Sequence, residues 1–74
     1  MASDKERREV AERLRAMTSY RSFKIPEVQA PLVDIDDLLT ALLGRRVYDS
    51  EASVYSSEAL YLADLIYPEG EDDD

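Results

Sequence analysis

The sequence predicts an all-α fold, a small three-helix domain with ordered loops and a disordered acidic C-terminal tail. Apolar residues recur at helical spacing in three segments, and each segment begins with residues that commonly cap helices. The expected helices span about 4–18, 35–43 and 57–67. With 74 residues the chain suffices for one domain, placed at residues 1–68, and the tail follows at 69–74.

The first helix begins with a capping box. Ser3 stands three residues before Glu6, so each side chain can bond the backbone N–H of the other residue. Val10, Leu14 and Met17 then form one narrow apolar stripe. The opposite face carries arginines interleaved with glutamates, and we interpret it as a solvated face rather than a phosphate site. These arginines are Arg7, Arg8, Arg13 and Arg15.

The second helix has clear signals at both ends. Asp34 is a good capping residue, and Val33 and Leu38 are spaced as a hydrophobic staple. Gly44 stands where helices commonly turn left-handed and end. Asp34 to Asp37 lack the glycine and glutamate of a calcium loop, so these aspartates are interpreted as helix-start residues.

The third helix repeats this pattern, with Ser56 as the expected cap, Tyr55 and Leu60 as a staple, and Pro68 as the stop. The core is expected to draw on all three helices. Its predicted members are Val10, Leu14, Met17, Leu38, Leu39, Leu42, Leu43, Leu60, Ala63 and Ile66.

Two segments join the helices. Residues 19–33 contain prolines and bulky apolar residues, which predicts an ordered extended loop that lays Tyr20 and Phe23 over the core. Residues 45–55 are expected to form a connector. Its two Val-Tyr pairs flank a polar stretch and are compatible with a small hairpin.

Composition excludes several classes of chemistry. The chain has no cysteine and no histidine, so disulfides, ordinary zinc sites and the commonest general base are absent. We expect no enzyme, no cofactor and no metal site. Residues 49–74 carry nine negative charges and no positive one, within a net charge of −8, which disfavours direct binding of nucleic acid. No apolar run could span a bilayer, and the N-terminus resembles no signal peptide, which favours the cytoplasm.

The function predicted from these features is a protein–protein interaction or regulatory module without catalytic activity. The third helix is apolar around much of its circumference, and its surplus face offers a candidate interface at Tyr61, Leu62 and Leu65. The expected partner is another protein or a second copy of the chain in a symmetric homodimer. The alternative is an acidic DNA-mimic inhibitor of phage origin, which needs carboxylates spread over a rigid surface.

Two stretches of the sequence, residues 4–15 (DKERREVAERLR) and 62–69 (LADLIYPE), carry a resemblance. Together they resemble the N-terminal region of short uncharacterised proteins of gut actinobacteria and their phages. The resemblance implies a prokaryotic or phage origin and the same succession of three helices. Many of those proteins continue into a cysteine-rich, zinc-ribbon-like segment, and the present sequence has no cysteine. The resemblance therefore implies no metal site, no activity and no functional residues.

Overall fold

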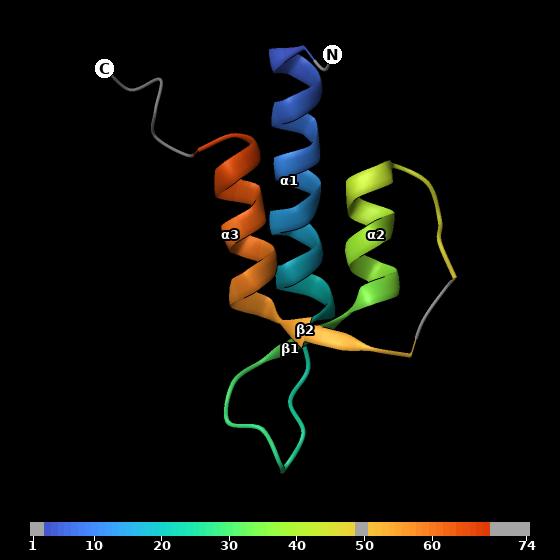
Figure 1. Ribbon diagram of the computed structural model, residues 1–74, viewed down its shortest axis with the longest axis vertical. Helices are drawn as coiled ribbons and strands as arrows, with labels where there is room; N and C mark the ends of the chain where they lie inside the picture. Colours follow the sequence, from blue (N-terminus) through green and yellow to red (C-terminus); the bar gives the residue numbers. More distant parts are fainter. Residues whose placement is uncertain (1–2, 49–50, 69–74) are drawn as a thin grey trace.

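The computed structural model describes residues 3–48 and 51–68, and these residues form three helices and a two-stranded antiparallel sheet (Figure 1). The all-α prediction is therefore wrong, and the fold is a mixed one. In chain order the elements are α1 (Asp4–Arg21), β1 (Leu32–Asp34), α2 (Ile35–Leu43), β2 (Ser53–Tyr55) and α3 (Ser56–Ile66). The predicted disordered tail, residues 69–74, lies outside the described residues.

Helix α1 begins with the predicted capping box. The backbone N–H of Glu6 donates to Ser3 Oγ over 3.1 Å, and the N–H of Ser3 donates to Glu6 Oε1 over 3.0 Å. The helix runs three residues beyond its predicted end at residue 18. At the predicted end, Thr18 is buried and its hydroxyl donates to the carbonyl oxygen of Leu14 over 2.7 Å, and the helix continues through three exposed residues.

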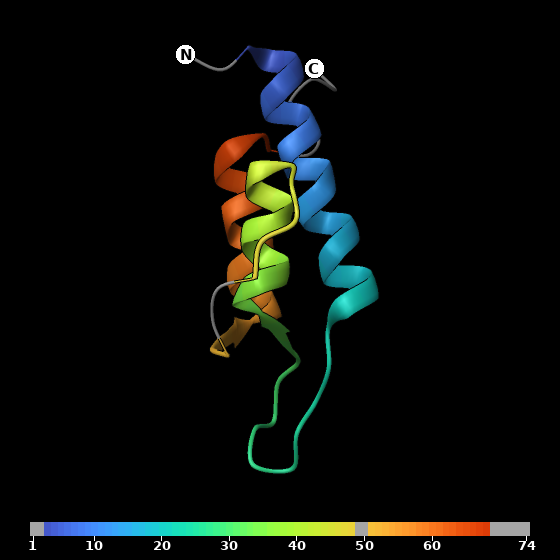
Figure 2. The ribbon, with the colours of Figure 1, turned by 90° about the vertical axis from the view of Figure 1, so that its right-hand side faces the viewer.

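The segment after α1 is a closed loop that extends away from the helices beyond the sheet (Figures 1 and 2). Two backbone hydrogen bonds between Phe23 and Leu32, of 2.9 and 2.8 Å, close it at its base. An ordered loop was predicted here, and it is found. The prediction that Tyr20 covers the core is wrong, because Tyr20 lies in α1 with 87% of its surface exposed.

The sheet pairs strands that a whole helix separates in the chain. Val33 lies opposite Val54, and Leu32 lies opposite Tyr55. The hairpin considered within residues 45–55 is wrong, because the second Val-Tyr pair of that segment bonds to β1 instead of to the first pair. Val33 is fully buried, so its backbone groups need partners that solvent cannot supply, and β2 supplies them.

Each strand leads directly into a helix, and this fixes the arrangement. Helices α2 and α3 rise from the two strands, and α1 packs against both of them (Figures 1 and 2). Ala11 of α1 and Ala59 and Ala63 of α3 are fully buried at the contact between these two helices. Small side chains there allow the helix axes to approach closely.

The ends of α2 and α3 agree closely with the sequence, although two caps differ. Helix α2 has the predicted bounds, and Gly44 follows it with a left-handed φ of 74°. Asp34 occupies the cap position but makes no capping hydrogen bond through its side chain. The cap position of α3 belongs to Tyr55, one residue earlier than predicted, and Ser56 is the first helical residue. Glu58 accepts the N–H of Tyr55 over 3.2 Å.

Seven of the ten predicted core residues are buried or pack against the buried cluster, and these are Val10, Leu14, Met17, Leu38, Leu42, Ala63 and Ile66. Leu39 is half-buried. The prediction is wrong for Leu43, which is 54% exposed, and for Leu60, which is also exposed. The buried stripe of α2 runs through Leu38 and Ala41, and Leu43 lies roughly 140° around the helix from Leu38.

Candidate functional site

The fold exposes only two of the three residues of the predicted interface on α3. Tyr61 and Leu65, one helical turn apart, are 64% and 60% exposed, whereas Leu62 is half-buried and packs against the core. Leu60 is exposed as well. The surface that α3 offers to a partner therefore contains Tyr61 and Leu65 but not Leu62.

This surface is acidic. No residue of α3 is basic, and its two acids are both exposed. Asp64 pairs with Arg15 of α1 over 2.9 Å, but most of its carboxylate surface stays exposed. We name the exposed positions Glu58, Leu60, Tyr61, Asp64 and Leu65 the α3 outer face.

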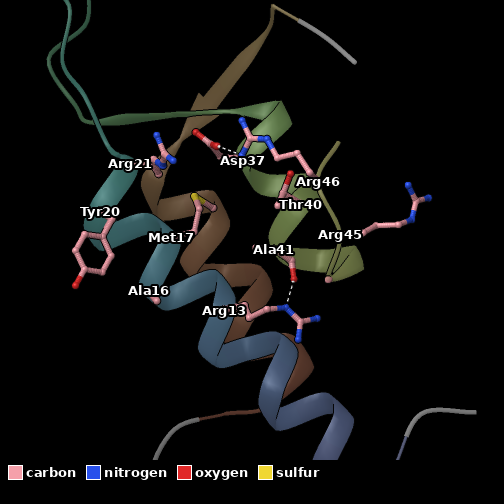
Figure 3. A pocket seen from close by; sticks show the side chains of 11 residues that line it. Arg13, Ala16, Met17, Tyr20, Arg21, Asp37, Thr40, Ala41, Arg45 and Arg46 are labelled. Atoms are coloured by element: carbon pink, nitrogen blue, oxygen red, sulfur yellow. Dashed lines mark hydrogen bonds and ion pairs between the residues drawn. The ribbon is translucent and has the colours of Figure 1, made fainter. Parts of the chain in front are cut away.

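A second surface was not predicted, and it is a groove of about 760 Å³ between the second half of α1 and the C-terminal end of α2 (Figure 3). Its apolar part includes Ala16 and Met17 of α1 and Ala41 of α2. Four arginines and one aspartate also line it, which gives the groove a net charge of +3. We name it the arginine groove, and its charged residues are Arg13, Arg21, Asp37, Arg45 and Arg46.

The single acid of the groove is already paired. Asp37 lies in the first turn of α2 with only 11% of its side chain exposed, and its Oδ1 is 3.4 Å from Arg46. Arg46 also lies over the ring of Tyr48, 4.9 Å from the ring centre. The pKa of Arg46 is raised, mainly by hydrogen bonding to the Tyr48 side chain and further by the charge of Asp37. Arg46 thus stays charged and neutralises Asp37.

Arg13 is positioned by the end of α2. Its Nε donates to the carbonyl oxygen of Ala41 over 2.8 Å, drawn as a dashed line in Figure 3. Carbonyls in the last turn of a helix have no partner within the helix, and they carry the negative end of its dipole. Gly44 allows this approach, because a Cβ there would lie 3.3 Å from Nη2 of Arg13. This hydrogen bond holds the Arg13 side chain of α1 against α2 at the edge of the groove.

Arg21 and Arg45 stand at the edges of the groove. Both residues are exposed, and neither has an ion pair within the part of the chain that the structure describes. Tyr20 lies beside Arg21 at the end of α1 (Figure 3). These two guanidinium groups are therefore available to an anionic ligand.

The other arginines of α1 bind the end of α3. Arg7 donates to the carbonyl oxygen of Ile66 over 3.1 Å, and Arg15 donates to that of Tyr67 over 3.0 Å. Arg8 donates to the phenol oxygen of Tyr67 over 3.1 Å and lies over its ring. The predicted solvated face is wrong for Arg7, Arg13 and Arg15, which are half-buried and bond to neighbouring helices, whereas Arg8 is exposed.

The sequence contained a signal for the groove that the prediction did not use. Arg13, Met17 and Arg21 recur every fourth residue, so they form one stripe along α1. Arg45 and Arg46 follow the end of α2 directly. Only the structure shows that this stripe of α1 faces the C-terminal end of α2.

The described residues show neither a metal site nor a membrane-spanning helix. Within residues 3–48 and 51–68 no group of three or more acidic side chains is arranged to hold a metal ion. No helix of this part of the chain has the length and apolarity needed to cross a membrane. Comparison with protein-family models, with curated proteins and with solved structures gave no match for the chain. The arginine groove and the α3 outer face combine exposed apolar and charged side chains, as a protein-binding surface does.

Proposed function

We propose that the chain is a small protein-interaction module without catalytic activity, which binds an acidic amphipathic segment of a partner protein in the arginine groove. The observation that carries the proposal is the charge of the groove. In a chain of net charge −8 it gathers four arginines and only one acid around an apolar floor. The cytoplasmic location expected from the sequence belongs to the same proposal, and fractionation of native cells would test it.

The groove offers two kinds of contact to such a segment. Arg21 and Arg45 can each bind a carboxylate through two parallel N–H groups, which is the strong geometry for this pair. Met17 and the alanines beside it can take an apolar side chain, and methionine adapts its shape to different partners. A segment with acids on one face and apolar residues on the other satisfies both requirements.

The ionisable groups of the groove do not suit catalysis. General acid–base catalysis is most effective when a group titrates near the working pH. The groove holds four arginines, which stay charged at all physiological pH values, and Asp37, which is paired with Arg46. Binding of an anionic segment needs only that the arginines stay charged, and it requires no group that gains or loses a proton.

A long nucleic acid is a weaker candidate than an acidic peptide. Six of the chain's 17 acidic residues lie outside the described residues, which leaves eleven against nine basic residues on the described part. A polyanion that extended beyond the groove would therefore meet acids such as those of α3. The DNA mimic needs a consistently acidic rigid surface, whereas all nine basic residues lie in the described part of the chain and four of them line the arginine groove.

Fluorescence anisotropy would test the proposal with two labelled peptides. The first probe is an amphipathic helix with glutamates on one face and leucines on the other, and the second has lysines in place of the glutamates. We expect the acidic probe to bind with a dissociation constant of roughly tens of micromolar. Binding should weaken as salt screens the charges. The lysine probe should not bind, and a short DNA duplex should compete poorly.

Charge reversal would locate the binding site. Arg21→Glu and Arg45→Glu should each weaken binding of the acidic probe by about tenfold, which corresponds to roughly 1.4 kcal/mol. Lys24→Glu is the matched control, because Lys24 is exposed in the loop after α1 and lies outside the groove. Equal binding of both peptides, or equal losses in Arg45→Glu and Lys24→Glu, would refute the proposal. Competition by DNA stronger than by unlabelled acidic peptide would assign the groove to nucleic acid instead.

A further inference from the structure

The chain carries two surfaces of opposite charge. The arginine groove has a net charge of +3 and an apolar floor. The α3 outer face has two acids, Glu58 and Asp64, and the exposed apolar side chains of Tyr61 and Leu65. The α3 outer face therefore has the composition that the groove is proposed to bind, an amphipathic helix with acids beside apolar residues.

The two surfaces lie on different sides of α1. Arg13 reaches the carbonyl oxygen of Ala41 on α2, whereas Arg15 reaches Asp64 of α3. Figure 1 shows α2 and α3 on either side of α1. Helix α3 also packs tightly on α1 through Ala59 and Ala63, so it cannot leave its place to enter the groove of its own chain. Only a second copy can bring an α3 outer face to the groove.

We propose that the arginine groove of one copy binds the α3 outer face of a second copy, so that the chains associate head to tail. This inference rests on the proposed function and names the partner as another molecule of the same chain. Tyr61 and Leu65 would lie on Met17 and its neighbouring alanines, and the acids of α3 would face the arginines at the groove's edges. Opposite charges and apolar contact then act in the same interface.

The charges favour this arrangement over a symmetric dimer through α3. In a two-fold dimer the same patch meets itself, and because α3 has no basic residue, the acids of one copy would face an α3 whose charges are all negative. Like charges brought together in an interface oppose association. In the head-to-tail arrangement each contact uses one groove and one face, so every bound pair keeps one of each unoccupied. Association then continues to longer chains or closes into a ring.

Sedimentation velocity with two complementary variants would test the arrangement. The groove variant is Arg21→Glu with Arg45→Glu, and the face variant is Tyr61→Ser with Leu65→Ser, which removes the apolar contact without adding a charge that the altered groove could bind. All four side chains are exposed, so both variants should fold, and circular dichroism would check this. Arg45→Glu alone, outside any helix, replaces the groove variant if the double change unfolds the chain.

The wild-type chain should sediment faster as its concentration rises from about ten to several hundred micromolar, and salt should reverse this. Each variant alone should remain a monomer. An equimolar mixture should form pairs and nothing larger, because the intact face of one variant fills the intact groove of the other and leaves only broken surfaces. Lys24→Glu should behave as the wild type.

Three results would overturn the inference. A wild-type chain that stays monomeric throughout would exclude self-association. A dimer that survives in the groove variant but not in the face variant would instead show the symmetric α3 interface. Variants that remain monomeric after mixing, while the wild type associates, would place the contact elsewhere. Binding of the acidic peptide by a strictly monomeric wild type would refute this inference alone and leave the proposed function standing.

Discussion

Gly44 at the end of α2 allows the sharpest test of the fold. Its φ of 74° lies in the left-handed region, and its N–H donates to the carbonyl oxygen of Thr40 over 2.9 Å. A residue with a Cβ is strained in this conformation by about 1–2 kcal/mol, whereas asparagine tolerates it better than others. Gly44→Asn should therefore destabilise the chain least and Gly44→Ala more. Gly44→Val should destabilise it most, because a β-branched side chain adds further crowding.

The magnitude follows from the size of the chain. For a domain of 60 to 100 residues each kcal/mol lowers the melting temperature by about 4–8 °C, so Gly44→Ala should melt roughly 4–16 °C below the wild type. Thermal and urea denaturation followed by circular dichroism would measure this. A melting temperature for Gly44→Ala equal to that of the wild type would refute the left-handed end of α2.

A new side chain at Gly44 would also crowd Arg13, and this effect can be measured separately from the backbone strain. The new Cβ would lie 3.3 Å from Nη2 of Arg13, which is a tight contact but with the mobile end of a side chain. We therefore expect the guanidinium to move and the coupling between Gly44→Ala and Arg13→Met to stay below about 0.5 kcal/mol. A double-mutant cycle would measure it. A larger coupling would mean that Arg13 is held rigidly at the end of α2.

Two further predictions use urea denaturation alone. Arg15→Met should lower the free energy of unfolding by about 1 kcal/mol, because it removes a partly buried bond to the carbonyl of Tyr67 as well as the exposed pair with Asp64. The exposed Lys5→Met serves as control, and an equal loss in both variants would contradict a joining role for Arg15. Asp34→Ala should change stability by less than about 0.5 kcal/mol, whereas a side chain that caps a helix contributes about 0.5–2 kcal/mol. A loss in that larger range would show that Asp34 caps α2 in solution.

Local signals in the sequence located the helices well. The bounds of α2 were predicted because both of its ends depend on neighbouring residues, namely the acidic first turn and Gly44. The start of α1 was predicted for the same reason, since both capping hydrogen bonds join Ser3 and Glu6, three residues apart in the sequence. The end of α1 was missed because the prolines and serines that follow suggested an earlier stop. In the structure the helix continues through exposed residues 19–21 before the chain becomes extended at Ser22.

The features that the sequence did not reveal depend on which segments become neighbours. The sheet joins residues on either side of α2, and strands of three residues are too short to show an alternating pattern. The groove likewise needs α1 beside α2, and these helices meet through buried residues such as Leu14 and Leu38 as well as through the hydrogen bond from Arg13 to Ala41. Two of the three candidate interface residues are exposed and the third is not, for a related reason. Helical periodicity showed that α3 has surplus apolar surface, but only the position of α1 decides that Leu62 turns inward and Tyr61 outward.

Replacing Ser56 with alanine distinguishes the sequence-based interpretation from the structure, because the two predict changes in the free energy of unfolding of opposite sign. As the predicted cap it would bind a backbone N–H, and alanine would lower stability by about 0.5–2 kcal/mol. In the structure Ser56 is instead the first residue of α3, buried to 5% exposure, and its hydroxyl has no hydrogen-bond partner among the described residues.

Burying an unpaired hydroxyl is unfavourable, and alanine also has the higher helix propensity. Ser56→Ala should therefore leave the free energy of unfolding unchanged or raise it by up to about 1 kcal/mol, while its exposed neighbour in Ser57→Ala should change it by less than about 0.5 kcal/mol. Urea denaturation of both variants would measure the difference. A loss of stability in Ser56→Ala alone would mean that α3 begins one residue later and that Ser56, not Tyr55, occupies its cap.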